Sequence, residues 1–246
     1  MSLTHFLIDL SERGLVPDFL IRAGIRNLCR KRLQQCKHDD CEANAELAEK
    51  YIADSDASPM AVLTEKANQQ HYEVPAEFYR YALGKNLKYS SCYYDSNTKS
   101  LDDAEDRALA LTSEHAELEN GLDILELGCG WGSLSLWMAK HFPDSQITSI
   151  SNSNSQREYI LGQARNRGYE NLKVITADIN EFTTDSTYDR VVSVEMFEHV
   201  RNHRELFSRI HGWLKSGGKL FTHVFCHRST SYPFEVEGED DWMSKH

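Results

Sequence analysis

Three glycines at alternate positions, Gly128, Gly130 and Gly132, are the part of this sequence best suited to bind a ligand. They follow the apolar segment 123–127 and precede the apolar segment 133–140, a pattern typical of a strand, a turn and a helix. Glycine adopts positive φ and lets a ligand approach the backbone, and the free N–H groups at the start of a helix favour an anionic group. Because the third glycine comes one residue too early for the dinucleotide-binding pattern, a nicotinamide cofactor is disfavoured.

A second group of reactive side chains follows the apolar segment 188–194, which is predicted to be a strand. Glu195, Glu198 and His199 supply two carboxylates and an imidazole. Ligands of open α/β sheets bind beyond the carboxyl ends of the strands, so this group would face whatever binds the glycines. A neighbouring carboxylate favours protonated His199 and burial opposes it, so the sequence leaves its charge open. The alternative is an ordinary surface helix with acids at its N-terminus.

The segment Glu126–Gly132 reads E-x-G-x-G-x-G and resembles the first motif of S-adenosylmethionine-dependent methyltransferases. The resemblance implies that the turn, including Cys129 and Trp131 between the glycines, holds the methionyl part of that cofactor, with Glu126 nearby. A turn without a ligand is the alternative. It is disfavoured because each glycine costs about 0.5–1 kcal/mol relative to alanine.

Strand-like and helix-like segments alternate in the second half of the chain. Strands are predicted at 123–127, 146–150, 172–176, 188–194 and 219–225, and the helices between them include 156–167 and 205–214. This alternation predicts an α/β fold with helices on both faces of a sheet. The resemblance implies that this is a Rossmann-like methyltransferase sheet. Because such a sheet normally has two further strands after the fifth, we expect the final two to be absent from this sequence.

The first 98 residues are predicted to be mainly helical. Apolar and basic residues recur at helical spacing after Pro17, and the segments 39–53 and 76–83 are also predicted helices. We expect residues 1–98 to form a helical N-terminal segment with a loop that covers the cofactor, and residues 99–246 to form the cofactor-binding domain.

Two short segments before the glycines make the resemblance more specific. Gln70–Tyr72 and Lys88–Ser90, taken with the glycine motif, resemble the cyclopropane fatty acid synthase family and its relatives, the coclaurine-type N-methyltransferases. In that family an aromatic residue and a serine close over the cofactor, which implies this role for Tyr89 and Ser90.

The family resemblance also implies residues for the nucleoside part of the cofactor. Many nucleotide-binding folds carry an acid after the second strand to bind the ribose, but this chain has the polar residues Ser151 and Asn152 there. The family uses a glutamine instead, which corresponds to Gln156. Asp178 and Ile179 correspond to the positions that border the adenine ring, although a plain turn would also explain an aspartate there.

The family has two branches, which differ after the fourth strand. Cyclopropane synthases carry a small residue where this chain has Glu195, whereas the amine methyltransferases read Glu-Met-Phe-Glu-His, as this chain does. The bicarbonate-binding cysteine of the synthases corresponds to Ser91, with Cys92 beside it, which disfavours bicarbonate-assisted proton removal. The glutamate and histidine shared by both branches correspond to Glu198 and His223. The resemblance therefore favours the N-methyltransferase branch.

The composition excludes several classes of protein. The net charge of −11 over 246 residues argues against nucleic acid as a main partner, because phosphate binding requires a concentrated basic surface. The six cysteines form no C-x-x-C pair, so we expect free thiols in a reducing compartment. The sequence has neither a signal-peptide pattern nor an apolar run of membrane-spanning length, and a cytoplasmic protein is expected.

Taken together, these residues predict an S-adenosylmethionine-dependent methyltransferase that N-methylates a small amine. Glu195 and Glu198 would hold the amine cation, and His199 would accept a proton to free its lone pair. Methyl transfer to unsaturated phospholipid acyl chains is one alternative, and it alone would require membrane contact. A non-catalytic cofactor-binding fragment is the other, because the family continues beyond residue 246.

Two further expectations concern metals and assembly. His199 and His203, and likewise His223 and His227, stand four residues apart, but no carboxylate motif completes a site at either pair, so no metal is expected. The exposed edge of the fifth strand would allow a homodimer.

Overall fold

The computed structural model describes residues 3–35, 41–61, 75–227 and 230. The segment Gln70–Tyr72, which contributes to the family resemblance, lies outside them. The chain divides into two compact units, one formed by Ser55–Phe225 and the other by Met1–Asp54 with Cys226–His246. Every candidate site residue lies in the first unit. The predicted domain boundary between residues 98 and 99 stays a prediction.

Helices account for most of the described chain before the sheet. They are α1 (Leu3–Glu12), α2 (Asp18–Gln35), α3 (Cys41–Asp56) and α5 (Ala76–Ala82). The helical character predicted for this region is confirmed where the structure describes it. None of the described helices is both long and apolar enough to cross a membrane.

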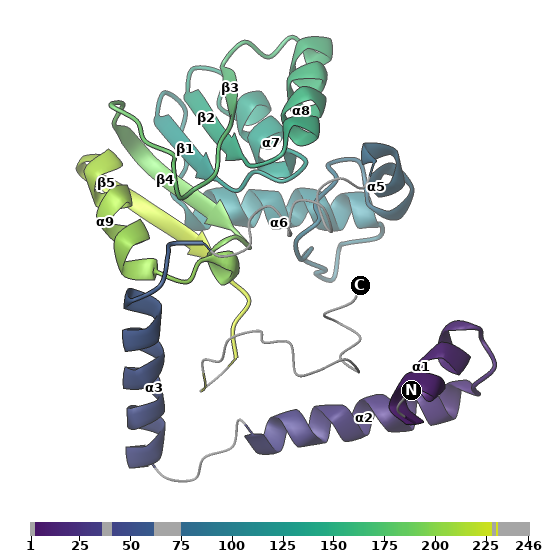
Figure 1. Ribbon diagram of the computed structural model, residues 1–246. Coiled ribbons are helices and arrows are strands. Elements are labelled where there is room, and N and C mark those ends of the chain that lie inside the picture. The colour runs from purple at the N-terminus through teal and green to yellow at the C-terminus, as the bar shows by residue number, and fades with distance from the viewer. Residues whose placement is uncertain (1–2, 36–40, 62–74, 228–229, 231–246) are drawn as a thin grey trace. The chain divides into compact units, whose positions relative to one another are not determined.

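The unit that carries the site is built on a parallel sheet of five strands, in the order β3-β2-β1-β4-β5 (Figure 1). The strands are β1 (Asp123–Leu127), β2 (Gln146–Ser151), β3 (Leu172–Thr176), β4 (Tyr188–Val194) and β5 (Leu214–His223). On one side of β1 the sheet continues with β2 and then β3. On the other side, β4 pairs with β1. In such sheets ligands bind where the strand order reverses, here at the carboxyl ends of β1 and β4.

Helices cover both faces of the sheet, as predicted (Figure 1). They are α6 (Leu101–His115), α7 (Ser133–His141), α8 (Asn154–Arg167) and α9 (His203–Trp213). Ile124 of β1 packs with residues of α6 and α7, whereas its neighbour Leu125 packs with residues of α9. This alternation follows from the period of two in a strand, and it gives β1 no face exposed to water.

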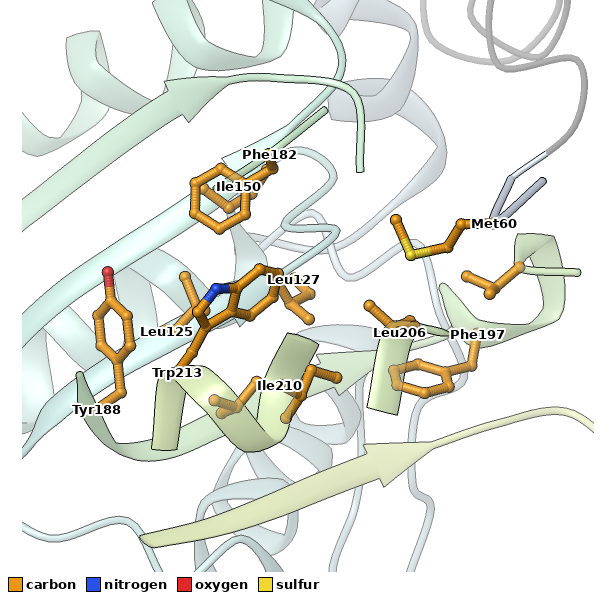
Figure 2. Packing of buried hydrophobic residues seen from close by; sticks show 12 residues of the cluster. Met60, Leu125, Leu127, Ile150, Phe182, Tyr188, Phe197, Leu206, Ile210 and Trp213 are labelled. Atoms are coloured by element: carbon orange, nitrogen blue, oxygen red, sulfur yellow. The ribbon is translucent and has the colours of Figure 1, made fainter. Parts of the chain in front are cut away.

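The core on the α9 face reaches the end of the sheet where the site lies. Figure 2 shows Leu206 and Ile210 of α9 beside Leu127 of β1, with Met60 and Phe197 at one end of the cluster. The backbone of Met60 accepts hydrogen bonds from Arg201 N at 2.7 Å and from Asn202 N at 3.3 Å. A segment far away in sequence is therefore fixed beside the turn that follows β4.

Local sequence signals account for two of the helix ends. Ser100 and Asp103 form a capping box at the start of α6, and Gly168 ends α8 in the left-handed conformation. The strand predicted at 219–225 instead spans Leu214–His223, and its register with β4 shifts from the pair Tyr188 and Leu214 to the pair Arg190 and Lys219. Pairing with β4 thus starts β5 before Gly217 and Gly218, two residues that are more typical of a turn.

Candidate functional site

The three glycines form a tight turn between β1 and α7, and all of them have positive φ, at 78°, 51° and 80°. A Cβ atom on Gly128 would lie 2.7 Å from Met196 Cγ, and one on Gly132 would lie 2.5 Å from Ile160 Cγ1. A Cβ atom on Gly130 would meet nothing within 4 Å. The outer glycines are therefore required by packing as well as by φ, and the middle one leaves its backbone open to a ligand.

The turn is held against the neighbouring strand by backbone hydrogen bonds. Gly128 N and Cys129 N both donate to Ile150 O near the end of β2, at 3.1 and 2.9 Å. Cys129 and Trp131 are buried. The glycine turn is thus rigidly joined to the carboxyl edge of the sheet.

Glu126 lies beneath the turn, on the face of β1 that α7 covers. It is buried, and its Oε2 accepts hydrogen bonds from Ser135 Oγ of α7 and, at 2.8 Å, from Ser149 Oγ of β2. Burial raises the pKa of Glu126 to about 7, and the two hydroxyl groups oppose that rise. These contacts join strand to helix, and the predicted closeness of Glu126 to the cofactor stays a prediction.

The polar residues after β2 are largely satisfied by one another. Ser151 Oγ donates to Gln156 Oε1 at 2.7 Å, and Ser153 N donates to Ser151 Oγ at 3.1 Å. Gln156 is buried, whereas Asn152 is half-buried. The structure therefore brings Ser151 and Gln156 together at the edge, with Gln156 turned into the protein.

The residues predicted to border the adenine ring lie at the end of β3. Asp178 Oδ1 accepts a hydrogen bond from Asn180 N at 2.8 Å, which is the geometry of an aspartate turn. Ile179 packs on the core cluster of the α9 face. Both residues are half-buried. The contacts give Asp178 a structural role and leave its role toward a ligand a prediction.

Tyr89 connects the segment 88–90 to the glycine turn through aromatic contacts. Its ring meets that of Tyr79 edge to face at 5.4 Å, and Tyr79 packs against Trp131 at the same centroid distance. Tyr89 is 66% exposed, so its ring can still cover a ligand. Ser90 is half-buried and accepts a hydrogen bond from Lys88 Nζ at 2.6 Å. No role was predicted for Lys88, although it is the first residue of the segment Lys88–Ser90 that contributes to the family resemblance.

The residues predicted for catalysis gather beyond β4 and β5. Glu195 N donates to His223 O at 2.8 Å, and Glu195 Oε1 lies 3.7 Å from His223 Nε2. Glu195 has a φ of 56°, an uncommon conformation for a residue with a side chain, which marks a strained backbone at this position. The structure thus brings together a carboxylate and an imidazole that are 28 positions apart in sequence.

Glu198 lies in the short helix η2 (Phe197–His199) directly after this strained residue. Its Oε1 accepts a hydrogen bond from Phe225 N, two residues beyond His223. Its Oε2 is buried and has no hydrogen-bond partner within the described residues. His199, the neighbour of Glu198, is exposed.

Two more buried oxygens without a partner among the described residues are Ser133 Oγ and Thr176 Oγ1. Ser133 begins α7 directly after the glycine turn, and Thr176 ends β3. Together with Glu198 Oε2, they lie at or just beyond the carboxyl ends of three strands. Buried polar atoms are nearly always paired, so three orphans along one edge fit a site for a polar ligand. Neither Ser133 nor Thr176 was among the predicted site residues, because a single hydroxyl residue carries no signal in sequence.

The paired histidines have no metal-like arrangement. His203 Nε2 lies 3.1 Å from Phe197 O, and its ring stacks on that of Phe197. Over the described residues, no group of three or more His, Cys, Asp and Glu side chains is placed to hold a metal ion. The expectation that the protein needs no metal stays a prediction.

Comparison with known proteins relates this arrangement to a family. The family model described as mycolic acid cyclopropane synthetase matches residues 62–246. An (S)-coclaurine N-methyltransferase from Thalictrum flavum subsp. glaucum is 37% identical over 98% of this chain, which covers 66% of that relative. The same enzyme from Papaver somniferum is 34% identical over 98% of this chain, which covers 68% of it.

A solved structure gives the same result at the level of the fold. The crystal structure of a coclaurine N-methyltransferase bound to N-methylheliamine and SAH matches 99% of this chain with a TM-score of 0.93 and 34% identity. This chain covers 70% of that structure, and it spans 66–68% of the two curated relatives, about two thirds of their length. On the evidence of its sequence and fold, the chain belongs to the mycolic acid cyclopropane synthetase family, within which it is similar to the coclaurine N-methyltransferases.

Proposed function

We propose that this chain is an S-adenosylmethionine-dependent methyltransferase that methylates the nitrogen of a small amine. The relatives of similar sequence are named for N-methylation of coclaurine, and the solved relative is bound to N-methylheliamine and SAH. The segment Glu-Met-Phe-Glu-His at 195–199 supports the amine branch of the family over the lipid branch.

The observation that carries the proposal is the buried Oε2 of Glu198, which no polar group of the described chain satisfies. Leaving a buried acceptor unsatisfied costs about 1–3 kcal/mol, and more when the group is charged. An ammonium group supplies both the missing donor and the opposite charge. Glu195 stands three residues before Glu198 and its side chain is 28% exposed, so a second carboxylate is available to the same cation.

The edge of the sheet fits the proposed cofactor. The open backbone at Gly130 and the orphaned hydroxyl of Ser133 would accept its methionyl part, and Tyr89 would cover it. The remaining residues that we propose to line the cofactor are Ser90, Glu126, Gly128, Cys129, Trp131, Gly132, Ser151, Asn152, Gln156, Asp178 and Ile179.

S-adenosylmethionine supplies a methyl group that its sulfonium has already activated, so the protein mainly aligns the nucleophile and handles a proton. Glu195 and Glu198 hold the amine, and His199 accepts the proton that frees its lone pair. That lone pair forms the N–C bond while the S–C bond breaks, and the electrons of the broken bond stay on sulfur. His223 contacts Glu195 and keeps its carboxylate directed to the edge.

The first test is calorimetric titration of the chain with S-adenosylmethionine and with S-adenosylhomocysteine. We expect micromolar binding of both. A folded sample that binds neither would contradict the proposal.

The second test uses methyl-labelled cofactor with a panel of cyclic secondary amines and, separately, with vesicles of unsaturated phospholipid. Label in the amines is the expected result. Label in the phospholipid would identify the cyclopropane-forming activity instead, and cofactor binding without any transfer would identify a non-catalytic binding protein. The cytoplasmic location, the homodimer and the absence of a nucleic-acid partner stay predictions.

A further inference from the structure

Lys88 is a buried lysine that the proposed mechanism does not use. It is 4% exposed, and Ser90 Oγ, at 2.6 Å, is the hydrogen-bond partner of its Nζ within the described residues. An ammonium group has three N–H donors, so two of them have no protein acceptor in that part of the chain. Lysine is rarely buried without a partner for its charge. A buried, under-satisfied ammonium is therefore a candidate binding group.

The backbone around Lys88 is fixed by a second buried residue, Glu105 of α6. The carboxylate of Glu105 accepts hydrogen bonds from Gly84 N at 2.9 Å, from Asn86 N at 2.7 Å and from Lys88 N at 3.1 Å. Glu105 is 0% exposed. Three charge-assisted bonds from a helix to one loop hold the position of Lys88 before any ligand binds.

Two observations relate Lys88 to the candidate site. Burial lowers the pKa of Lys88, and the charges of Cys92, Glu195 and Glu105 oppose that change. Glu195 belongs to the group beyond β4, and Tyr89, the next residue along the chain, connects through Tyr79 to Trp131 of the glycine turn. Lys88 thus precedes the residue that is linked through Tyr79 to the glycine turn, and it lies within electrostatic range of Glu195.

We propose that Lys88 and Ser90 together bind the carboxylate of the methionine part of S-adenosylmethionine, with Lys88 as the buried counter-charge. This inference rests on the proposed function and names a ligand group for one part of that site. The cofactor carries a single anionic group, its carboxylate, whereas its sulfonium and amino groups are cationic. Because Lys88 would repel both cationic groups, the carboxylate is the part of the cofactor that it suits. Ser90 accepts from Lys88 and so keeps its own hydroxyl hydrogen to donate to the same carboxylate.

The test compares two ligands that share the adenosine and the thioether sulfur but differ in the carboxylate. S-adenosylhomocysteine has it, and 5′-methylthioadenosine lacks it together with the amino group. Each is titrated by calorimetry into the wild type, Lys88→Met and Ser90→Ala. Lys85→Met is the matched control, since Lys85 lies in the same loop but is exposed and paired with Asp106 at 2.6 Å.

We expect Lys88→Met to weaken binding of S-adenosylhomocysteine by about tenfold or more, as for the loss of a hydrogen bond to a charged group. Ser90→Ala should weaken it by about fivefold. Binding of 5′-methylthioadenosine should stay within about twofold of wild type in both, and Lys85→Met should change neither ligand. Thermal unfolding of each variant verifies that it is folded, and Ser90→Ala decides the question if Lys88→Met does not fold.

Three outcomes would overturn the inference. Equal weakening of both ligands would make Lys88 a purely structural residue, and unchanged binding of both would place it away from the cofactor. Equal affinity of the wild type for the two ligands would mean that no carboxylate subsite exists, although the proposed function would stand. Wild-type chain that binds neither ligand would instead contradict the proposed function itself.

Discussion

Two turns at the carboxyl edge of the sheet have the same position in the fold and opposite construction. The glycine turn (residues 128–132) follows β1, and the acid turn (residues 195–199) follows β4, the neighbouring strand. In the glycine turn the residues with positive φ are glycines, whereas in the acid turn the residue with positive φ is Glu195, at 56°. The two turns are in contact, because the side chain of Met196 in the acid turn occupies the position that a Cβ atom on Gly128 would need.

The acids beside the two turns differ in the same way. Glu126, under the glycine turn, is buried with two serine hydroxyls on one carboxylate oxygen. Glu198 in the acid turn has a buried oxygen that no described residue bonds. The acid beside the glycine turn is thus satisfied by the protein, whereas the acid turn combines the positive φ of Glu195 with a carboxylate oxygen that the described residues leave unbonded. Features that lower stability without a structural benefit are expected where a ligand supplies the compensation.

The largest effect is expected from Gly132→Ala. The new methyl group would meet Ile160, which is 0% exposed and cannot move aside, at a φ of 80°. Strain and overpacking together should lower the free energy of unfolding by about 4 kcal/mol. Urea unfolding measures the change. Gly162→Ala is the control, because a Cβ there meets nothing within 4 Å in the interior of α8, and it should leave stability unchanged or slightly higher. Equal effects of both substitutions would contradict the packing argument.

Glu126 should contribute to the pH dependence of the free energy of unfolding. Glu126 has a folded pKa of about 7 against an ordinary value of 4.5, so the folded state holds its proton more tightly than the unfolded state. Its contribution is fully present below pH 4.5 and is lost as the pH rises toward 7, by about 3 kcal/mol in total.

Glu126→Gln should therefore flatten the fall in stability over this range and make the variant more stable than wild type at pH 8. Urea unfolding at a series of pH values is the measurement. An unchanged slope in the variant would show that another group titrates there.

Glu198→Gln tests the unsatisfied acid. It keeps the shape and the bond from Phe225 N but removes the charge, so we expect turnover of the amine to fall about a hundredfold, or about 2.7 kcal/mol in activation free energy, without loss of stability. Steady-state kinetics and thermal unfolding give the two readouts. Glu181→Gln, at an exposed acid, is the matched control. A destabilised Glu198→Gln with normal turnover would make Glu198 a structural residue.

The smallest effect is expected from relief of strain at Glu195. Glycine adopts positive φ readily, so Glu195→Gly should be more stable than Glu195→Ala by about 1 kcal/mol, although both lose the carboxylate and its contact with His223. Comparing the two variants separates backbone strain from charge. If alanine is the more stable of the two, the conformation of this residue costs nothing.

Much of the fold was predictable because its signals are local. The strands at 123–127, 172–176 and 188–194 have the predicted bounds, since each is a short apolar run between turn residues. The start of β5 was misplaced because Gly217 and Gly218 indicate a turn, whereas pairing of Leu214 with Tyr188 extends the strand through a bulge. The residues of one strand do not by themselves determine where its pairing with a neighbouring strand begins.

The features of the candidate site also fall into those that are local in the sequence and those that depend on contacts between separate elements. Glycine spacing and the segment 195–199 marked both turns, because those chemical groups are consecutive in the sequence. The contact of Glu195 with His223, the clamp of Glu105 on the loop before Tyr89 and the burial of Lys88 involve residues from separate elements. Only packing decides which of them meet.

The sequence by itself determined the alternation of strands and helices, the two turns and the resemblance to one family, because these depend on residue type and spacing over short distances. The tertiary structure decided which polar atoms are buried and which of those lack a partner. Burial depends on what every other element covers, and it converts an ordinary glutamate, serine or lysine into a group that needs a ligand. Ser133, Thr176, Glu198 and Lys88 acquire their significance in that way.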